Sequence, residues 1–250
     1  MKQRIKRTLR GTIRDILIAA ALVGAIFGGS ALWDETRQAA ASDYEMPARP
    51  TSEEDEPEPR VDFAALRRGA PEALAWISVP GTRIDYPVVQ WTDNQYYLKR
   101  TARHEHSSYG AIFMDYRSNG NFTDFYTIIY GHNMRSGKMF GTLRQFRDPD
   151  FFDRVEYGTL QTPGQTYRLH FFAWAAVSSV GPCYKSLTFV TPGEKQAFFD
   201  MAKEKAGRWR NIALGPEDRI LALSTCFSSS GNTRMIVFAK LESVEPGADG

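Results

Sequence analysis

The sequence is poor in several features that would point to common functions. It has only two cysteines and four histidines among 250 residues, and no internal repeat is evident. A net charge of +2 leaves no basic patch of the kind that nucleic acid binding requires. One disulfide, Cys183–Cys226, is the most that two cysteines permit, and the sequence alone does not exclude it. With 24% charged and 42% apolar residues, the composition suits one globular domain with additional segments.

Charge is distributed unevenly along the chain. Residues 1–33 carry six basic residues and one acid, and the eighteen residues 16–33 carry no charge at all. Such a run is long enough to cross a bilayer core of about 30 Å. Because the basic residues precede it, we expect 1–15 to be cytoplasmic, 16–33 to be a membrane anchor and the rest to lie outside. The alternative is a cleaved signal peptide, whose apolar region is usually shorter.

The segment after the apolar run is acidic and rich in proline. Residues 34–60 contain nine acids and three basic residues, and they end in RPTSEEDEPEPR. Like charges and prolines prevent a packed core, so this segment is predicted to be an extended linker. We expect a folded domain over residues 61–242 and a flexible tail over 243–250.

Short β-like runs separated by turn residues dominate the predicted domain. Their number and spacing favour a β-barrel or sandwich. Residues 61–77 have helical spacing broken at Gly69-Ala70-Pro71 and predict two short helices, and further helices are expected after Gly137 and at about 193–209. The eight expected strands are 75–79, 83–90, 110–114, 125–130, 156–161, 167–178, 219–225 and 234–241.

A cysteine and an arginine stand at facing ends of the last two expected strands. Cys226 follows the apolar run RILALST, and Arg234 comes eight residues later at the start of the next strand. A hairpin would place the guanidinium near the sulfur, where a permanently charged group can stabilise a thiolate or an oxyanion. A cysteine nucleophile also needs a proton acceptor, usually a histidine.

One of the four histidines has the same position at a strand end as the cysteine. His132 directly follows the apolar run FYTIIYG. His170 lies inside an alternating strand and is better explained by packing or surface exposure. His104 and His106 form an H-x-H pair, but no third ligand is apparent, so we expect no metal and no cofactor.

Several blocks together resemble the sortases, which are membrane-anchored cysteine transpeptidases of Gram-positive bacteria. The blocks YGHNM and GKMFGTLRQF, then LSTC and an arginine on the following strand, occur in the family's order. The blocks AWISVPGTRIDYPVVQ, DNQYYL and GAIFMDYR also look like family blocks. The resemblance covers about residues 61–242. The N-terminal helices and the helix at 193–209 resemble class B.

The resemblance implies a closed eight-stranded β-barrel and assigns roles to residues. It implies that Cys226 is the nucleophile, His132 the general acid/base and Arg234 the stabiliser of oxyanion and substrate, in agreement with the pattern of residues. The backbone N–H of Phe227 would also face the oxyanion. The residues expected to line the substrate groove are Asn94, Leu98, Tyr184, Ser224, Thr225 and Phe227.

The chain departs from the class B pattern at two places. Many members have an acidic residue just after the cysteine, whereas Phe227 and two serines follow here, and no carboxylate is identifiable that would orient His132. The stretch GPCYKSLTF around Tyr184 also differs, and it brings an unexpected cysteine, Cys183, next to the groove. The recognised peptide motif is therefore open.

The function that the resemblance implies is transfer of a secreted protein to a cell-wall amine. A C-terminal sorting signal, NPxTN or a variant such as SPxTG, would be cleaved after threonine through a thioester. The expected partners are secreted proteins with such a signal and a lipid-linked peptidoglycan precursor amine, and the expected location is the cell membrane. The alternatives are a pilin-polymerising sortase, a cysteine peptidase that transfers to water, an L,D-transpeptidase, and a non-enzymatic tethered binding domain.

Overall fold

The structure is a computed structural model that describes residues 60–226 and 232–244. The described chain contains nine strands, two short 3-10 helices and four α-helices. The strands are β1 (Ala73–Ser78), β2 (Asp85–Val89), β3 (Ile112–Met114), β4 (Tyr126–Tyr130), β5 (Tyr157–Gln161), β6 (Thr166–Ser178), β7 (Ala206–Trp209), β8 (Arg219–Cys226) and β9 (Thr233–Ser243). The helices are α2 (Phe63–Gly69), η1 (Tyr96–Leu98), η2 (Gly141–Arg147), α3 (Pro149–Arg154), α4 (Pro182–Lys185) and α5 (Pro192–Lys205).

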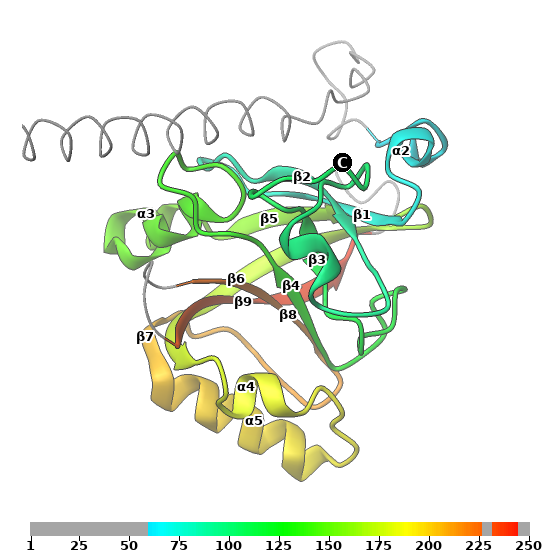
Figure 1. The fold of residues 1–250 in the computed structure, drawn as a ribbon. Helices are drawn as coiled ribbons and strands as arrows, with labels where there is room; N and C mark the ends of the chain where they lie inside the picture. Colours follow the sequence, from blue (N-terminus) through cyan, green and yellow to red (C-terminus); the bar gives the residue numbers. More distant parts are fainter. Residues whose placement is uncertain (1–59, 227–231, 245–250) are drawn as a thin grey trace, which may run out of the picture. The chain divides into compact units, whose positions relative to one another are not determined.

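Eight of the nine strands close into a barrel, as the sequence predicts. The order is β5-β1-β2-β3-β4-β8-β9-β6-β7, and pairing of β5 with β6 closes the ring. β7 extends the sheet beyond β6 and is the strand that lies outside the closed ring. Figure 1 shows the long strands β6, β8 and β9 running side by side through the middle of the domain.

Two neighbouring pairs in the ring are parallel, which makes the barrel mixed. β2 pairs with β3, and β4 pairs with β8, in parallel, while the other strand pairs are antiparallel. Parallel neighbours need a crossover connection, because a tight hairpin cannot join them. Residues 131–218, which include β5, β6, β7 and the helices between them, provide that connection from β4 to β8.

The sequence prediction of two N-terminal helices is wrong in part. Of the described residues before β2, only Phe63–Gly69 form a helix, whose Asp62 caps the N-terminus by accepting the N–H of Ala65. The expected second helix is β1 instead. Its residues pair with β2 on one side and with β5 on the other, so strand pairing overrides the local helical spacing.

Two other expected helices are present but differ in extent. After Gly137 the helix is of the 3-10 type and begins only at Gly141, although the apolar residues Met139, Phe140, Leu143 and Phe146, expected on one helical face, are all buried. The helix predicted over 193–209 ends at Lys205, and Ala206–Trp209 form β7, which the sequence analysis missed. Gly207 allows this strand to pass β6 closely, since a Cβ there would lie 2.3 Å from the Trp174 ring.

The long helix α5 packs against the outside of the barrel and completes a hydrophobic cluster. A capping box fixes its start, with the side chains of Thr191 and Glu194 bonded reciprocally to backbone N–H groups. Phe198 and Phe199 are buried on its inner face, together with side chains from β4, β6, β8 and β9. Figure 1 shows α4 and α5 on the same side of the barrel, below the strands.

The predicted membrane anchor and linker lie outside the described residues. Among the residues that the structure describes, no helix is long and apolar enough to cross a membrane. The predicted domain boundary at 61 lies next to Asp62, the N-cap of α2. The predicted tail begins at Ser243, which is still the last residue of β9.

Removal of the Phe198 ring is expected to destabilise the domain strongly. Phe198 is 3% exposed and contacts the rings of Phe125, Tyr126 and Phe238 among others. We expect Phe198→Ala to lower the free energy of unfolding by about 3–5 kcal/mol, measured by urea denaturation of the full-length chain in detergent. The matched control is Gln196→Ala on the exposed side of α5, for which a change within about 0.5 kcal/mol is expected. Equal effects of the two changes would contradict the assignment of the inner face.

Candidate active site

The strands β4, β8 and β9 bring three of the predicted residues to the same level of the barrel. The parallel pairing of β4 with β8 matches Tyr130 with Ser224, and two residues later the chain carries His132 just past the end of β4 and Cys226 at the end of β8. The β8–β9 pairing matches Cys226 directly with Arg234. Because neighbouring strands lie about 4.8 Å apart, the backbone of Cys226 lies next to that of Arg234, while His132 follows the end of the strand on the other side of β8.

His132 is oriented by a backbone carbonyl. Its Nε2 lies 2.9 Å from the carbonyl oxygen of Leu98, at the end of η1. A carbonyl can only accept, so Nε2 carries the proton and, in the neutral ring, Nδ1 is the basic nitrogen. The carbonyl of His132 accepts the N–H of Phe140, which fixes the backbone as well. The sequence analysis found no carboxylate to orient this ring, and Leu98 provides the orientation through its main chain.

The residue before the histidine has to be a glycine. A Cβ at Gly131 would lie 2.5 Å from Cδ1 of Ile112 and 2.6 Å from Cγ of Phe140. The Gly131 N–H also donates to the carbonyl of Ser224 at 3.1 Å, which extends the ladder between β4 and β8 by one bond. The tight packing around Gly131 therefore fixes the position of the backbone from which His132 extends.

The two residues before the cysteine are both buried but differ in their surroundings. The hydroxyl of Ser224 lies 2.7 Å from the hydroxyl of Tyr184, which links β8 to α4. Thr225 is 4% exposed, and its Oγ1 has no hydrogen-bond partner among the described residues. Tyr184 also lies parallel to Tyr130, with 6.4 Å between ring centroids.

Behind these residues lies a carboxylate that the sequence analysis did not select. Asp115 directly follows β3, and its side chain is 0% exposed. Its Oδ2 accepts the Tyr130 hydroxyl at 2.8 Å and the Asn94 Nδ2 at 3.0 Å. The Asn94 Oδ1 in turn accepts the N–H of Tyr116 at 3.0 Å. The predicted groove residue Asn94 is thus bonded within the protein at both ends of its amide.

An arginine neutralises this carboxylate and connects it to α4. Arg117 donates from Nε to Oδ1 of Asp115 at 2.9 Å and from Nη2 to Oδ2 at 2.8 Å. Its remaining N–H groups donate to the carbonyls of Tyr184 and Lys185, at 3.1 and 3.3 Å. Burial raises the pKa of Asp115, but hydrogen bonds from Arg117 and Tyr130 outweigh it, so the pKa lies below its usual value.

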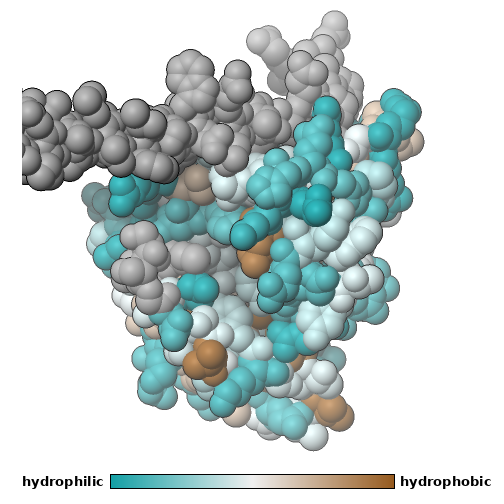
Figure 2. Space-filling view, viewed as in Figure 1, coloured by the Kyte–Doolittle hydropathy of each residue, from teal (hydrophilic) through white to brown (hydrophobic). Residues whose placement is uncertain are grey.

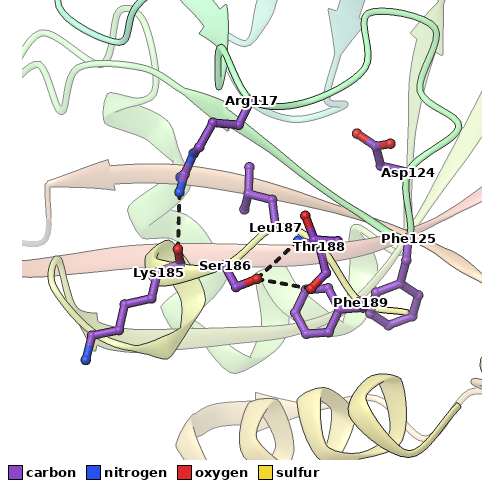
Figure 3. A pocket seen from close by; sticks show the side chains of 8 residues that line it. All are labelled: Arg117, Asp124, Phe125, Lys185, Ser186, Leu187, Thr188 and Phe189. Carbon is purple, nitrogen blue, oxygen red and sulfur yellow. Dashed lines mark hydrogen bonds between the residues drawn. The ribbon is translucent and has the colours of Figure 1, made fainter. Parts of the chain in front are cut away.

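Arg117 also lines a hollow next to α4. Figure 3 shows this pocket between the loop that follows β3 and residues 185–189, with the Arg117 guanidinium pointing at the Lys185 carbonyl. Its volume is about 300 Å³. Ser186 closes residues 186–188 into a turn, since its hydroxyl bonds both the N–H and the carbonyl of Thr188. Figure 2 shows that the face drawn is mainly hydrophilic, with hydrophobic residues in small separate spots.

The structure answers several questions that the sequence left open. Cys183 is a free, buried cysteine, so the disulfide considered above is absent. Phe227 lies outside the described residues. His170, on β6, bonds Glu156 and Glu242, and His104 bonds Glu72 and the hydroxyl of Tyr96. No group of three potential metal ligands occurs among the residues described.

Three residues near the site were missed from sequence: Asp115, Arg117 and Tyr130. One signal was available, because Asp115 follows an apolar strand directly, as His132 and Cys226 nearly do. The block GAIFMDYR contains both Asp115 and Arg117, but nothing in it indicates which main-chain groups they bind.

Comparison with known proteins identifies relatives over most of the domain. The sortase domain family model matches residues 77–242. The chain is 31% identical over 186 residues to sortase B of Listeria monocytogenes, covering 74% of this chain and 75% of the relative. Sortase B of Bacillus anthracis matches at a TM-score of 0.71 with 31% identity, covering 85% of this chain and 98% of that one. Sortase B from the type II pilus of Streptococcus pneumoniae matches at 0.64 with 39% identity, covering 74% and 100%.

The thiol of Cys183 is expected to be inert in the folded protein. Burial raises its pKa to about 11, and its sulfur lies 3.7 Å from that of Met201. Because this pKa is raised from 9.0 to about 11, the fraction of Cys183 present as thiolate near pH 8 is about 100-fold lower than for an ordinary thiol. In the Cys226→Ala chain, iodoacetamide should therefore label Cys183 very slowly until urea unfolds the protein, as read by mass spectrometry. Fast labelling of the folded variant would show that the thiol is accessible.

Proposed function

Because the chain belongs to the sortase family, and within it to class B, we propose that it is a cysteine transpeptidase acting on sorting signals. The observation that carries the proposal is the backbone register. The register pairs Cys226 with Arg234, and β4, the other neighbour of β8, ends two residues before His132. The carbonyl of Leu98 supports it further, because it fixes which nitrogen of the histidine is free to exchange a proton.

The proposed reaction is acyl transfer in two steps. The Cys226 thiolate attacks the carbonyl carbon of the signal's threonine, and the oxyanion that forms is stabilised by Arg234 and the Phe227 N–H. The C–N bond then breaks as imidazolium His132 gives its proton to the departing amine, leaving a thioester. An acceptor amine attacks the thioester, His132 takes up the amine's proton, and the Cys226 thiolate leaves.

The proposed substrates are secreted proteins with an NPxTN-like signal or a variant, and the proposed acceptor is a peptidoglycan precursor amine. The apolar run 16–33 supports a membrane location with residues 1–15 in the cytoplasm and the domain outside. Such an anchor keeps the domain where both a secreted protein and a lipid-linked amine arrive. No cofactor is part of the proposed reaction.

A second candidate is polymerisation of pilins, in which the acceptor is an amine of another pilin. It is favoured by one observation, the 39% identity to a sortase B from a pneumococcal type II pilus. The residues and steps are the same in both cases, so the acceptor alone distinguishes them.

The test is product analysis with the full-length chain in detergent. Peptides with NPxTN, SPxTG and LPxTG motifs are incubated with and without an amine, either a diamine, a glycine peptide or a lysine peptide, and read by mass spectrometry. An amine-dependent ligated product establishes transfer, and the preferred amine separates wall attachment from pilin polymerisation. Cleavage to the acid alone indicates a peptidase.

The variants assign the roles. Cys226→Ala is expected to abolish the thioester and the product, and His132→Ala to lower the turnover rate by about 10²–10⁴-fold. Arg234→Lys keeps a cation but loses the planar fork of donors, and about 10²-fold is expected. His170→Ala is the matched control, because that histidine lies on β6 away from the strand ends. Full activity of Cys226→Ala would refute the mechanism, and an unreactive Cys226 would favour a binding domain.

A further inference from the structure

We propose that Asp115 is a positioning residue that, together with Arg117, holds the walls of the peptide groove at a fixed distance from the three strand ends. This inference rests on the proposed function, since it assigns the carboxylate a role in peptide binding. It adds a residue that neither contacts the reacting atoms nor lies on β4, β8 or β9.

The first connection fixes the wall that contains η1. The bonds of Asn94 to Asp115 and to the N–H of Tyr116 tie the loop before η1 to the end of β3. η1 then ends at Leu98, whose carbonyl orients His132. Any shift of this loop therefore moves both a predicted groove residue and the hydrogen bond that sets the histidine's tautomer.

The second connection goes through Tyr130 at the end of β4. Its hydroxyl donates to Asp115, and its ring lies parallel to the ring of Tyr184. The hydroxyl of Tyr184 is bonded to that of Ser224, two residues before the cysteine. The carboxylate thus fixes the rotation of an aromatic ring that supports the opposite wall.

The third connection is the guanidinium of Arg117. Two of its nitrogens bind the carboxylate while Nη1 and Nη2 also reach the carbonyls of Tyr184 and Lys185 in α4. A planar group with five donors can serve both sides at once, and a lysine ammonium cannot. Through Arg117, Asp115 is connected to the C-terminal end of α4 and holds its position relative to the strand ends.

The alternative is that Asp115 merely stabilises the fold, and its surroundings argue against this. Among the described residues, the donors that reach its oxygens come from Asn94, Arg117 and Tyr130, each of which leads to a segment with a predicted groove residue. Asp124, which lies on the same loop and lines the same hollow, instead accepts the N–H of Asn119 within that loop. Asp124 thus bonds within its own loop, whereas Asp115 connects separate segments of the chain.

Asp115→Asn is the first test, because it keeps the shape but replaces one acceptor oxygen by a donor. We expect KM for a sorting-signal peptide to rise roughly tenfold or more, with a smaller change in kcat, as for loss of charge-assisted bonds that hold a binding surface. The rate at which iodoacetamide alkylates Cys226 should stay within about twofold of the wild type, because the thiol itself is not touched. Arg117→Lys should act in the same direction, and Asp124→Asn, the matched control, should leave all three quantities unchanged.

Hydrogen exchange tests the structural part without any activity. In Asp115→Asn and Arg117→Lys, amide exchange is expected to accelerate in residues 94–98 and 182–189, and not in β6 or β9. If the wild-type chain transfers no peptide, the proposed function fails, and this exchange pattern still decides whether Asp115 holds the two walls.

Three outcomes would overturn the inference. One is a wild-type KM and exchange pattern in both variants. Another is faster exchange throughout the barrel with KM unchanged, which is the result of a general stabilising role. If Asp115→Asn does not fold, Tyr130→Phe and Arg117→Lys decide instead, and an unchanged KM in both would refute the proposal.

Discussion

The parallel pairing of β4 with β8 is the constraint on which the rest of the site depends. Parallel neighbours end at the same edge of a sheet, so a residue just past the end of one strand lies beside a residue just past the end of the other. His132 and Cys226 are 94 positions apart in sequence and become neighbours in this way. The antiparallel partner β9 then adds Arg234 at the same level. Backbone register thus brings residues that are distant in sequence to one edge of the sheet.

Beside this edge lie loops and the short helices η1 and α4, which are held by buried apolar side chains and by polar contacts. η1 and α4 are only three and four residues long, too short to be stable by their own backbone bonds. Tyr97 of η1 and Cys183 of α4 are buried in the core, and the Asp115–Arg117 ion pair, of which Asp115 is buried, adds hydrogen bonds to Asn94 and to α4. Such bonds are directional, so they fix orientation where an apolar contact would fix only proximity.

The sequence predicted the barrel strands well because strands depend on local patterns. Alternating apolar runs mark strands, and a polar residue directly after such a run is placed at an edge, as for Cys226 and His132. β7 was missed because the residues before it have strong helical character, and the chain leaves the helix where residues 206–209 pair with β6. The orientation of His132 by a carbonyl has no side-chain signal at all. Asp115 and Arg117 are visible as residue types, but their partners lie on loops whose approach is decided by the whole fold.

The position of β9 in the sheet has a consequence for how the chain acquires its fold. This strand is the last in sequence, yet it lies between β8 and β6 and pairs along nearly its whole length with both. A chain that emerges from its N-terminal end therefore holds β6 and β8 with open edges until residues 233–243 arrive. Contacts so distant in sequence make folding slow, and unpaired strand edges invite association with other chains. Loss of the final strand would therefore open the barrel between β8 and β6 rather than shorten the sheet at an edge.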